Sequence, residues 1–315
     1  MVKIEKEFKF IDLFAGIGGI RMPFQNLGGE CVFSSEIDKF ATQTYEANYG
    51  DKPSGDITKI EANTIPDFDI LLAGFPCQAF SIAGKREGFN DTRGTMFFEV
   101  ERILKEKQPK CFLLENVKGL VNHNQGETFR TMIDVLENKL GYKVFTKIMN
   151  AKNFGLPQNR ERIMIVGFKN KDIEFTFPEE PNTPTKVGDI LEDNPHEKYT
   201  ISDKIWASHQ RRKEKNREKG NGFGYSLFNK DSEYTSTISA RYYKDGSEIL
   251  IEQENKNPRK LTPREAARLQ GYPDSFKIEV SDVQAYKQFG NSVPVKMINA
   301  VATKMYETLK QEGEI

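Results

Sequence analysis

An apolar strand, a glycine-rich turn and a helix open this chain, and their order restricts the fold more than any other feature. The segment from Phe8 to Phe14 is rich in Phe and Ile and predicts a buried strand. Ala15-Gly-Ile-Gly-Gly19 follows it, and a helix is expected from there to about Leu27. This order is typical of nucleotide-binding α/β folds. Arg21 replaces the third glycine of the full dinucleotide pattern, so the turn alone does not identify the ligand.

Two carboxylates follow at the ends of predicted strands. A second strand is expected from Glu30 to Ser35, and Glu36 stands 20 residues after Gly16. A carboxylate at this spacing can accept hydrogen bonds from both hydroxyls of a ribose. The alternative for Glu36 is an exposed carboxylate at the start of the next helix. Asp56 lies at a further turn of this kind, where it can meet an adenine amino group.

A cysteine stands at the most distinctive turn of the chain. Asp69 to Ala73 predicts a short buried strand, and Gly74 and Pro76 end it just before Cys77. The carboxyl ends of strands are where ligands bind in open α/β sheets. A lone cysteine is more often buried and inert. The Gly-Phe-Pro-Cys sequence instead favours a thiol held toward a cleft.

The segment from Ser81 to Gly94 has three glycines, several basic residues and no periodicity. A structureless segment of this length is usually functional or disordered. We interpret it as a mobile lid that carries polar side chains toward phosphates, and the alternative is an ordinary solvated loop. The side chains in question are Ser81, Lys85, Arg86 and Arg93.

Charged residues also mark the next two strands. Pro109 to Leu114 predicts a buried strand that ends in Glu115. Burial at this position would raise the pKa of the Glu115 carboxyl. The alternative is that Glu115 only caps the next helix. Arg160 and Arg162 precede another apolar strand and point to one face if the backbone is extended. They predict an anion or a carbonyl oxygen as partner, and surface ion pairs are the alternative.

Composition excludes several classes of protein. The 46 basic and 46 acidic residues cancel, so a nucleic-acid surface would need segregated charge rather than an excess. The sequence has no apolar run of about 18 residues, which argues against a transmembrane helix. Three separated cysteines without a ligand cluster predict a reduced cytosolic protein that holds no metal.

The composition changes at a Pro-rich linker, Glu179 to Thr185. We therefore expect two domains: residues 1–180 completed by 286–315, and residues 181–285 with the hinge. Tyr234 to Gly246 predicts two short strands with an Asp-Gly turn, and its side chains suit contacts with phosphates and base edges. Arg241 is the expected guanine reader, with phosphate contact as the alternative.

Taken together, these motifs resemble those of the bacterial C5-specific DNA cytosine methyltransferases of restriction–modification systems. The resemblance covers nearly the whole chain, and in length and order it is close to the small members that methylate GCGC. The matching blocks are Asp12 to Gly19, Glu36 to Asp38, Gly55-Asp56, Gly74 to Ser81, Asp91 to Gly94, Glu115 to Val117, Gln158 to Arg162, Arg259 to Phe276 and Gly290 to Pro294.

The resemblance implies an α/β fold: a Rossmann-like mixed sheet flanked by helices, with a smaller irregular target-recognition domain. It implies S-adenosylmethionine as cofactor, held by Phe14, Gly16, Gly18, Glu36, Ile37, Asp56, Pro76 and Asn291. It implies double-stranded DNA as substrate, contacted by Gln78, Ser81, Lys85, Arg86, Arg93, Thr237, Ser239, Arg241 and Tyr242.

The family's chemistry suits the residue types. Cytosine C5 is a weak nucleophile, and thiolate addition at C6 makes it enamine-like. The resemblance implies that Cys77 is this thiolate. It also implies that protonated Glu115 gives a proton to N3 and holds the exocyclic amine. It implies further that Arg162 stabilises O2 and that Arg160 orders the site. The target base must leave the duplex to react.

Two departures bear on the ligands. Ile37 stands where relatives often carry a Trp that stacks on adenine. The recognition segment, Thr237 to Leu250, resembles that of enzymes whose sites begin with CC, such as CCGG or CCNGG. We expect a monomeric, cytoplasmic bacterial enzyme that is paired with a restriction endonuclease.

Three other classes compete with this interpretation. A tRNA cytosine methyltransferase would carry a Cys-Phe-Thr signature in the recognition region, and this chain has no Cys after Cys111. An inactive DNA-binding paralogue would not need Cys77, Glu115 and Arg162 together. A nicotinamide oxidoreductase shares the glycine turn but does not explain the Gly-Phe-Pro-Cys sequence.

Overall fold

A six-stranded mixed sheet forms the centre of the computed structural model, which describes residues 7–76, 96–220 and 224–315. The strands lie in the order β2-β1-β3-β4-β6-β5. Their bounds are β1 Phe8–Leu13, β2 Gly29–Ser35, β3 Ile70–Gly74, β4 Cys111–Val117, β5 Lys143–Asn150 and β6 Glu161–Phe168. Strands β2, β1, β3 and β4 are parallel, and β6 runs antiparallel to both neighbours. The predicted α/β class is confirmed.

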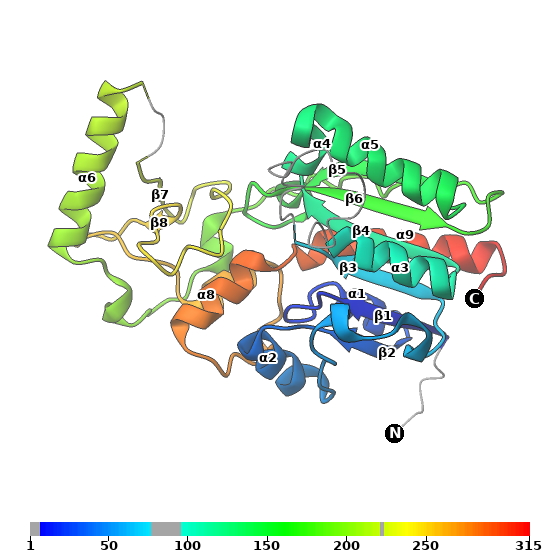
Figure 1. Cartoon of the computed structure of the whole chain (residues 1–315). Coiled ribbons are helices and arrows are strands. Elements are labelled where there is room, and N and C mark those ends of the chain that lie inside the picture. The colour runs from blue at the N-terminus through cyan, green and yellow to red at the C-terminus, as the bar shows by residue number, and fades with distance from the viewer. Residues whose placement is uncertain (1–6, 77–95, 221–223) are drawn as a thin grey trace.

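Helices cover both faces of this sheet (Figure 1). They are α1 Arg21–Asn26, α2 Lys39–Tyr49, α3 Met96–Lys107, α4 Gly119–Asn122, α5 Glu127–Asp134 and α9 Val295–Gln311. Alternation along β3 shows why two layers form. Leu71 and Ala73 join the core beneath α3 and α5, whereas Ile70 and Leu72 join the core beneath α1 and α9. The strand is apolar throughout because both of its faces are buried.

The remaining elements extend from one end of the sheet (Figure 1). They are α6 Asp203–Glu218, α7 Pro263–Leu269, α8 Asp282–Asn291, and a two-stranded parallel pair, β7 Leu227–Phe228 and β8 Leu250–Ile251. A third core joins Ile238, Tyr242 and Phe289 from this part to Ile17 and Ala41 beside the sheet. None of the described helices is long and apolar enough to cross a membrane.

Two expectations about secondary structure are wrong. Residues 234–246 contain turns and a single bridge residue rather than two strands. Gln288 to Asn291, expected as a polar turn, instead form the end of α8. The predicted capping box at α7 is present, with Thr262 Oγ1 accepting from Glu265 N at 3.1 Å.

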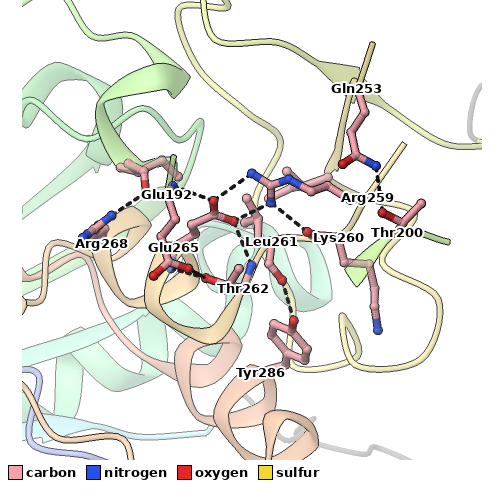
Figure 2. Close-up of polar contacts among 12 residues, drawn as sticks. Glu192, Thr200, Gln253, Arg259, Lys260, Leu261, Thr262, Glu265, Arg268 and Tyr286 are labelled. Carbon is pink, nitrogen blue, oxygen red and sulfur yellow. Dashed lines mark hydrogen bonds and ion pairs between the residues drawn. The ribbon is translucent and has the colours of Figure 1, made fainter. Parts of the chain in front are cut away.

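A buried ion pair connects α7 to the preceding segment (Figure 2). Arg259 donates from Nη1 to Glu265 Oε2 at 2.7 Å and from Nη2 to Oε1 at 2.8 Å. The same carboxylate accepts the backbone N–H groups of Glu192 and Thr262, both at 2.8 Å. Each oxygen thus has two donors, and α7 is fixed to the loop that carries Glu192.

We expect Arg259→Met to lower the free energy of unfolding by about 3–5 kcal/mol, because it leaves Glu265 buried without its counterion. Urea unfolding measures the loss. Lys256→Met is the matched control, since it removes a solvent-exposed pair with Glu197 that should contribute little to stability. Equal losses in the two variants would contradict a structural role for the buried pair.

Candidate active site

A cavity of about 930 Å³ lies at the carboxyl ends of the parallel strands. Its volume is within the range of about 300–1,000 Å³ that is usual for ligand pockets. Its walls include the residues that follow β1 and β2, the end of β3, the end of β4, and the turn between α8 and α9. The sheet therefore gathers strand ends that are far apart in the sequence, as parallel topology requires.

Seven of the eight residues predicted to hold the cofactor line this cavity: Phe14, Gly16, Glu36, Ile37, Asp56, Pro76 and Asn291. Glu36 is held firmly, because its carboxylate accepts from Gly16 N at 2.8 Å and from Asp38 N at 2.7 Å. Ile37 is 77% exposed at the cavity wall, so its side chain is accessible to a ligand in the cavity.

Gly18, the eighth, does not line the cavity. Its carbonyl accepts from the Tyr49 hydroxyl at 2.7 Å, and its φ is +79°. A Cβ at this position would lie 2.2 Å from the Tyr49 ring. Glycine is therefore required for helix packing and backbone conformation, and a cofactor contact does not explain it.

Glu115 and Arg162 meet at the cavity wall. Arg162 Nε lies 2.9 Å from Glu115 Oε1, and both side chains are nearly buried. Burial raises the pKa of Glu115 despite the nearby Arg162 and Arg160 guanidinium groups. Burial likewise lowers the pKa of Arg162, against the attraction of Glu115. The pair thus places a carboxyl group with a raised pKa, Glu115, next to the guanidinium group of Arg162.

The strand that leads to Cys77 lies directly beside this pair. Gly74 of β3 is the register partner of Glu115 in β4. Asn116 Nδ2 donates to the Phe75 carbonyl at 2.9 Å, which ties the end of β4 to the turn after β3. Cys77 itself lies outside the described residues, as do Gln78, Ser81, Lys85, Arg86 and Arg93.

Arg160 differs from its neighbour Arg162. Its side chain lines the cavity, but both Nη atoms donate to backbone carbonyls: Nη1 to Ile238 and Nη2 to Gly290 and Ser292. Burial lowers the pKa of Arg160 well below its usual value. The Nη donors of this arginine are thus directed to the protein backbone and not toward a base.

The predicted DNA-contacting residues of the recognition segment fall into three groups. Arg241 is exposed and lines the cavity mouth. Thr237 and Ser239 are partly buried, and their hydroxyls donate at 2.5 Å to the Asn159 carbonyl and to Glu248 Oε1 respectively. Tyr242 is fully buried, so its predicted DNA contact is wrong.

The burial of Tyr242 has a clear cause. Its hydroxyl donates to the Ile249 carbonyl at 2.7 Å and accepts from Leu261 N at 2.8 Å. Its ring packs edge-on against Tyr286, with centroids 5.1 Å apart. The Tyr242 hydroxyl makes both of its hydrogen bonds within the core, so burial of the ring leaves no polar group unpaired.

Sequence reasoning missed several cavity residues, namely Asp12, Asn116, Tyr243, Gln284, Lys287 and Gln288. The last three share one face of α8 because they are three and four residues apart, a spacing that would have been visible had the helix been predicted. Asp12 stands within an apolar strand, and burial raises its pKa well above the usual range.

The polar groups of the cavity suit a polar ligand. Among the described residues, four buried side-chain atoms make no well-aligned hydrogen bond: Asp12 Oδ2, Arg160 Nε, Gln288 Nε2 and Glu115 Oε1, whose one polar contact is the ion pair with Arg162. All four belong to residues that line this one cavity. Buried polar groups are normally satisfied, so their concentration here favours a binding site for a polar ligand. No metal-binding group of His, Cys, Asp and Glu is found in the described residues.

The sheet order and the cavity together define the S-adenosylmethionine-dependent methyltransferase fold. The structure is similar to that of Dnmt2 methyltransferase from S. pombe, with a TM-score of 0.80 over 97% of this chain and 99% of that chain, at 21% identity. It is also similar to the methyltransferase EhMeth of Entamoeba histolytica, with a TM-score of 0.78 over 98% and 99%, at 20% identity.

The family model for C-5 cytosine-specific DNA methylase matches residues 8–307, and the chain belongs to this family. It is 63% identical over 310 residues to type II methyltransferase M1.ScrFI of Lactococcus lactis subsp. cremoris, covering 97% of this chain and 79% of that one. It is 62% identical over 305 residues to M.NlaX of Neisseria lactamica (96% and 97%) and 51% identical over 326 residues to M.HpaII of Haemophilus parainfluenzae (97% and 91%). The chain is a DNA cytosine-5-methyltransferase of the restriction–modification type.

Proposed function

We propose that this enzyme methylates C5 of a flipped-out cytosine, in a short specific site of double-stranded DNA, through a covalent bond between Cys77 and C6. The observation that carries the proposal is the buried Glu115–Arg162 pair beside the turn that leads to Cys77. When bound, S-adenosylmethionine supplies a methyl group on a positively charged sulfur. The cavity residues that would hold it are Phe14, Gly16, Glu36, Ile37, Asp56, Pro76 and Asn291.

The residues of the chain divide the chemistry between them. The Cys77 thiolate forms a bond to C6 as the C5–C6 double bond opens. Protonated Glu115 gives its proton to N3, and Arg162 donates a hydrogen bond to O2, where negative charge develops. C5 would then take the methyl group as the sulfur–methyl bond breaks, with S-adenosylhomocysteine as the leaving group. Loss of the C5 proton to water restores the double bond as the bond between sulfur and C6 breaks, and N3 returns its proton to Glu115.

The proposal includes the organisation of the chain. Residues 1–180 with 286–315 form the catalytic and cofactor-binding domain, and residues 181–285 form the target-recognition domain. The packing of α9 against α1 and the sheet supports the return of the C-terminus to the first domain. The enzyme acts as a cytoplasmic monomer on a site that begins with CC, such as CCGG or CCNGG, and protects host DNA from a cognate endonuclease.

Trapping on DNA that contains 5-fluorocytosine tests this function. Fluorine at C5 cannot leave as a proton does, so the Cys77 adduct should accumulate as a protein–DNA band that resists denaturation. The band should require S-adenosylmethionine. Bisulfite sequencing of plasmid DNA from an expressing strain would identify the methylated site. Methylation without a trapped adduct would exclude the covalent route, and methylated RNA with unmodified DNA would exclude the DNA substrate.

Arg241 provides a test of sequence recognition. We propose that it reads a guanine, because it is exposed at the cavity mouth within the recognition segment. Arg241→Ala should then lose about 1–3 kcal/mol of discrimination at one position of the site. Binding titrations on the mapped site and on single-mismatch duplexes, at two salt concentrations, measure this loss. Equal weakening on every duplex with a smaller salt dependence would show that Arg241 contacts phosphate instead.

A further inference from the structure

Arg160 joins two segments that are far apart in the sequence. Its side chain is 1% exposed, and Nη1 donates to the Ile238 carbonyl at 3.0 Å. Nη2 donates to the carbonyls of Gly290 at 3.1 Å and Ser292 at 2.6 Å. We call this arrangement the Arg160 junction. One guanidinium group therefore fixes the recognition segment to the C-terminal end of α8.

The junction requires arginine specifically. A planar guanidinium presents five N–H donors in a fixed fork, whereas an ammonium group on a flexible stem cannot place three bonds in this geometry. The Gly290 and Ser292 carbonyls also lie at the C-terminal end of α8, where the helix dipole favours a cation. Lysine would keep the charge but lose part of the connection.

Backbone packing makes the contact rigid. A Cβ on Gly290 would lie 2.3 Å from the backbone carbon and oxygen of Ser239, so the two segments touch without a side chain between them. Gln158 reinforces the contact, because its Oε1 accepts from Ile238 N at 3.0 Å and its Nε2 donates to the Leu269 carbonyl at 3.2 Å. A displacement of the recognition segment must therefore be transmitted to its neighbours.

Both segments form walls of the same cavity. Gly290, Asn291 and Ser292 line it on one side of the junction, and Ala240 and Arg241 line it on the other. Asn291, a proposed cofactor residue, stands between the two residues whose carbonyls Arg160 holds. The recognition segment and the cofactor wall can thus shift together but not separately.

We propose that Arg160 is a positioning residue that couples occupation of the recognition segment by DNA to the affinity of the cofactor cavity. The inference rests on the proposed function, since it takes the recognition segment as the part of the chain that reads DNA. Such coupling is reciprocal: DNA tightens cofactor binding by the factor by which cofactor tightens DNA binding. Coupling factors are typically about 5–150-fold.

Calorimetric titration with S-adenosylhomocysteine, with and without plasmid fragments, measures this factor directly. Plasmid fragments carry many copies of any short site, so the exact sequence need not be known. The wild-type enzyme should bind S-adenosylhomocysteine more tightly when DNA is present. In Arg160→Lys the ratio of the two affinities should fall toward one, with a smaller change in the affinity measured without DNA.

Gly290→Ala is a second test, because its methyl group presses on Ser239 while the guanidinium remains. It should also lower the ratio. Arg268→Lys is the matched control: this arginine bonds Asp274 and the Ile190 carbonyl away from the junction, and the ratio should stay at the wild-type value. Cooperative melting of each variant verifies folding.

Two results would overturn the inference. One is a folded Arg160→Lys or Gly290→Ala variant that keeps the wild-type ratio. The other is an equal loss of affinity with and without DNA, which indicates a local structural role only. Trapping on 5-fluorocytosine DNA is independent of these titrations. The wild-type enzyme could trap DNA while Arg160→Lys retains the full affinity ratio. That combination of results would contradict the inference and leave the proposed function intact.

Discussion

Cys77→Ser should abolish methyl transfer while the protein still folds and binds both S-adenosylhomocysteine and DNA. A serine hydroxyl does not ionise near neutral pH, whereas an ordinary thiol has a pKa of about 8.5 that cationic neighbours lower further. Loss of a covalent nucleophile costs up to about 10⁶-fold in kcat in a well-measured hydrolase. Transfer of a tritiated methyl group to plasmid DNA measures the loss, and calorimetry measures the two affinities.

Cys31→Ser is the matched control for this experiment. Cys31 is half-buried in β2, and its sulfur lies 3.4 Å from the Phe33 carbonyl. Burial raises the pKa of this thiol to about 12, so it is not a nucleophile near neutral pH. The control should keep its methyl transfer activity. A Cys77→Ser variant that loses cofactor binding in parallel with turnover would mean that Cys77 supports structure instead of chemistry.

The central sheet could be predicted because its strands carry their own signals. Most of them contain a short apolar run that ends near a glycine or a charged residue, and β3 between Asp69 and Phe75 is the clearest case. The edge of the sheet could be predicted with it, because strand ends in such a fold converge. Glu36 and Glu115 were predicted for that reason, and Arg162 was predicted from its alternation with Arg160. All three line the cavity.

What failed depends on contacts between distant residues. Tyr242 stands among Thr, Ser and Arg and resembles a surface residue, yet its hydroxyl bonds Ile249 and Leu261 within a core. Helix α8 ends in Gln, Gly and Asn, which locally favour a turn, and tertiary packing overrides that preference. The three carbonyl partners of Arg160 lie at least 78 positions away, so no spacing rule could reveal them.

Glu115→Gln should slow methyl transfer by about 10²–10⁴-fold, the usual contribution of a general acid. The amide can still hydrogen-bond to cytosine but cannot deliver a proton to N3. Base flipping should persist, since it depends on binding rather than on proton transfer. The matched control is Glu161→Gln, which replaces an exposed carboxylate that pairs with Lys118 at 2.9 Å. It should retain near wild-type turnover in the tritium assay.

The pH dependence of this reaction identifies the group that Gln removes. Burial raises the pKa of Glu115, so the active, protonated form is lost as pH rises through that raised value. The Cys77 thiolate has the opposite dependence, since its active form accumulates as pH rises. The wild-type kcat should therefore be bell-shaped in pH. Glu115→Gln should lose the alkaline limb and keep the rise that belongs to the thiolate. An alkaline limb that survives in Glu115→Gln would assign the proton at N3 to another group.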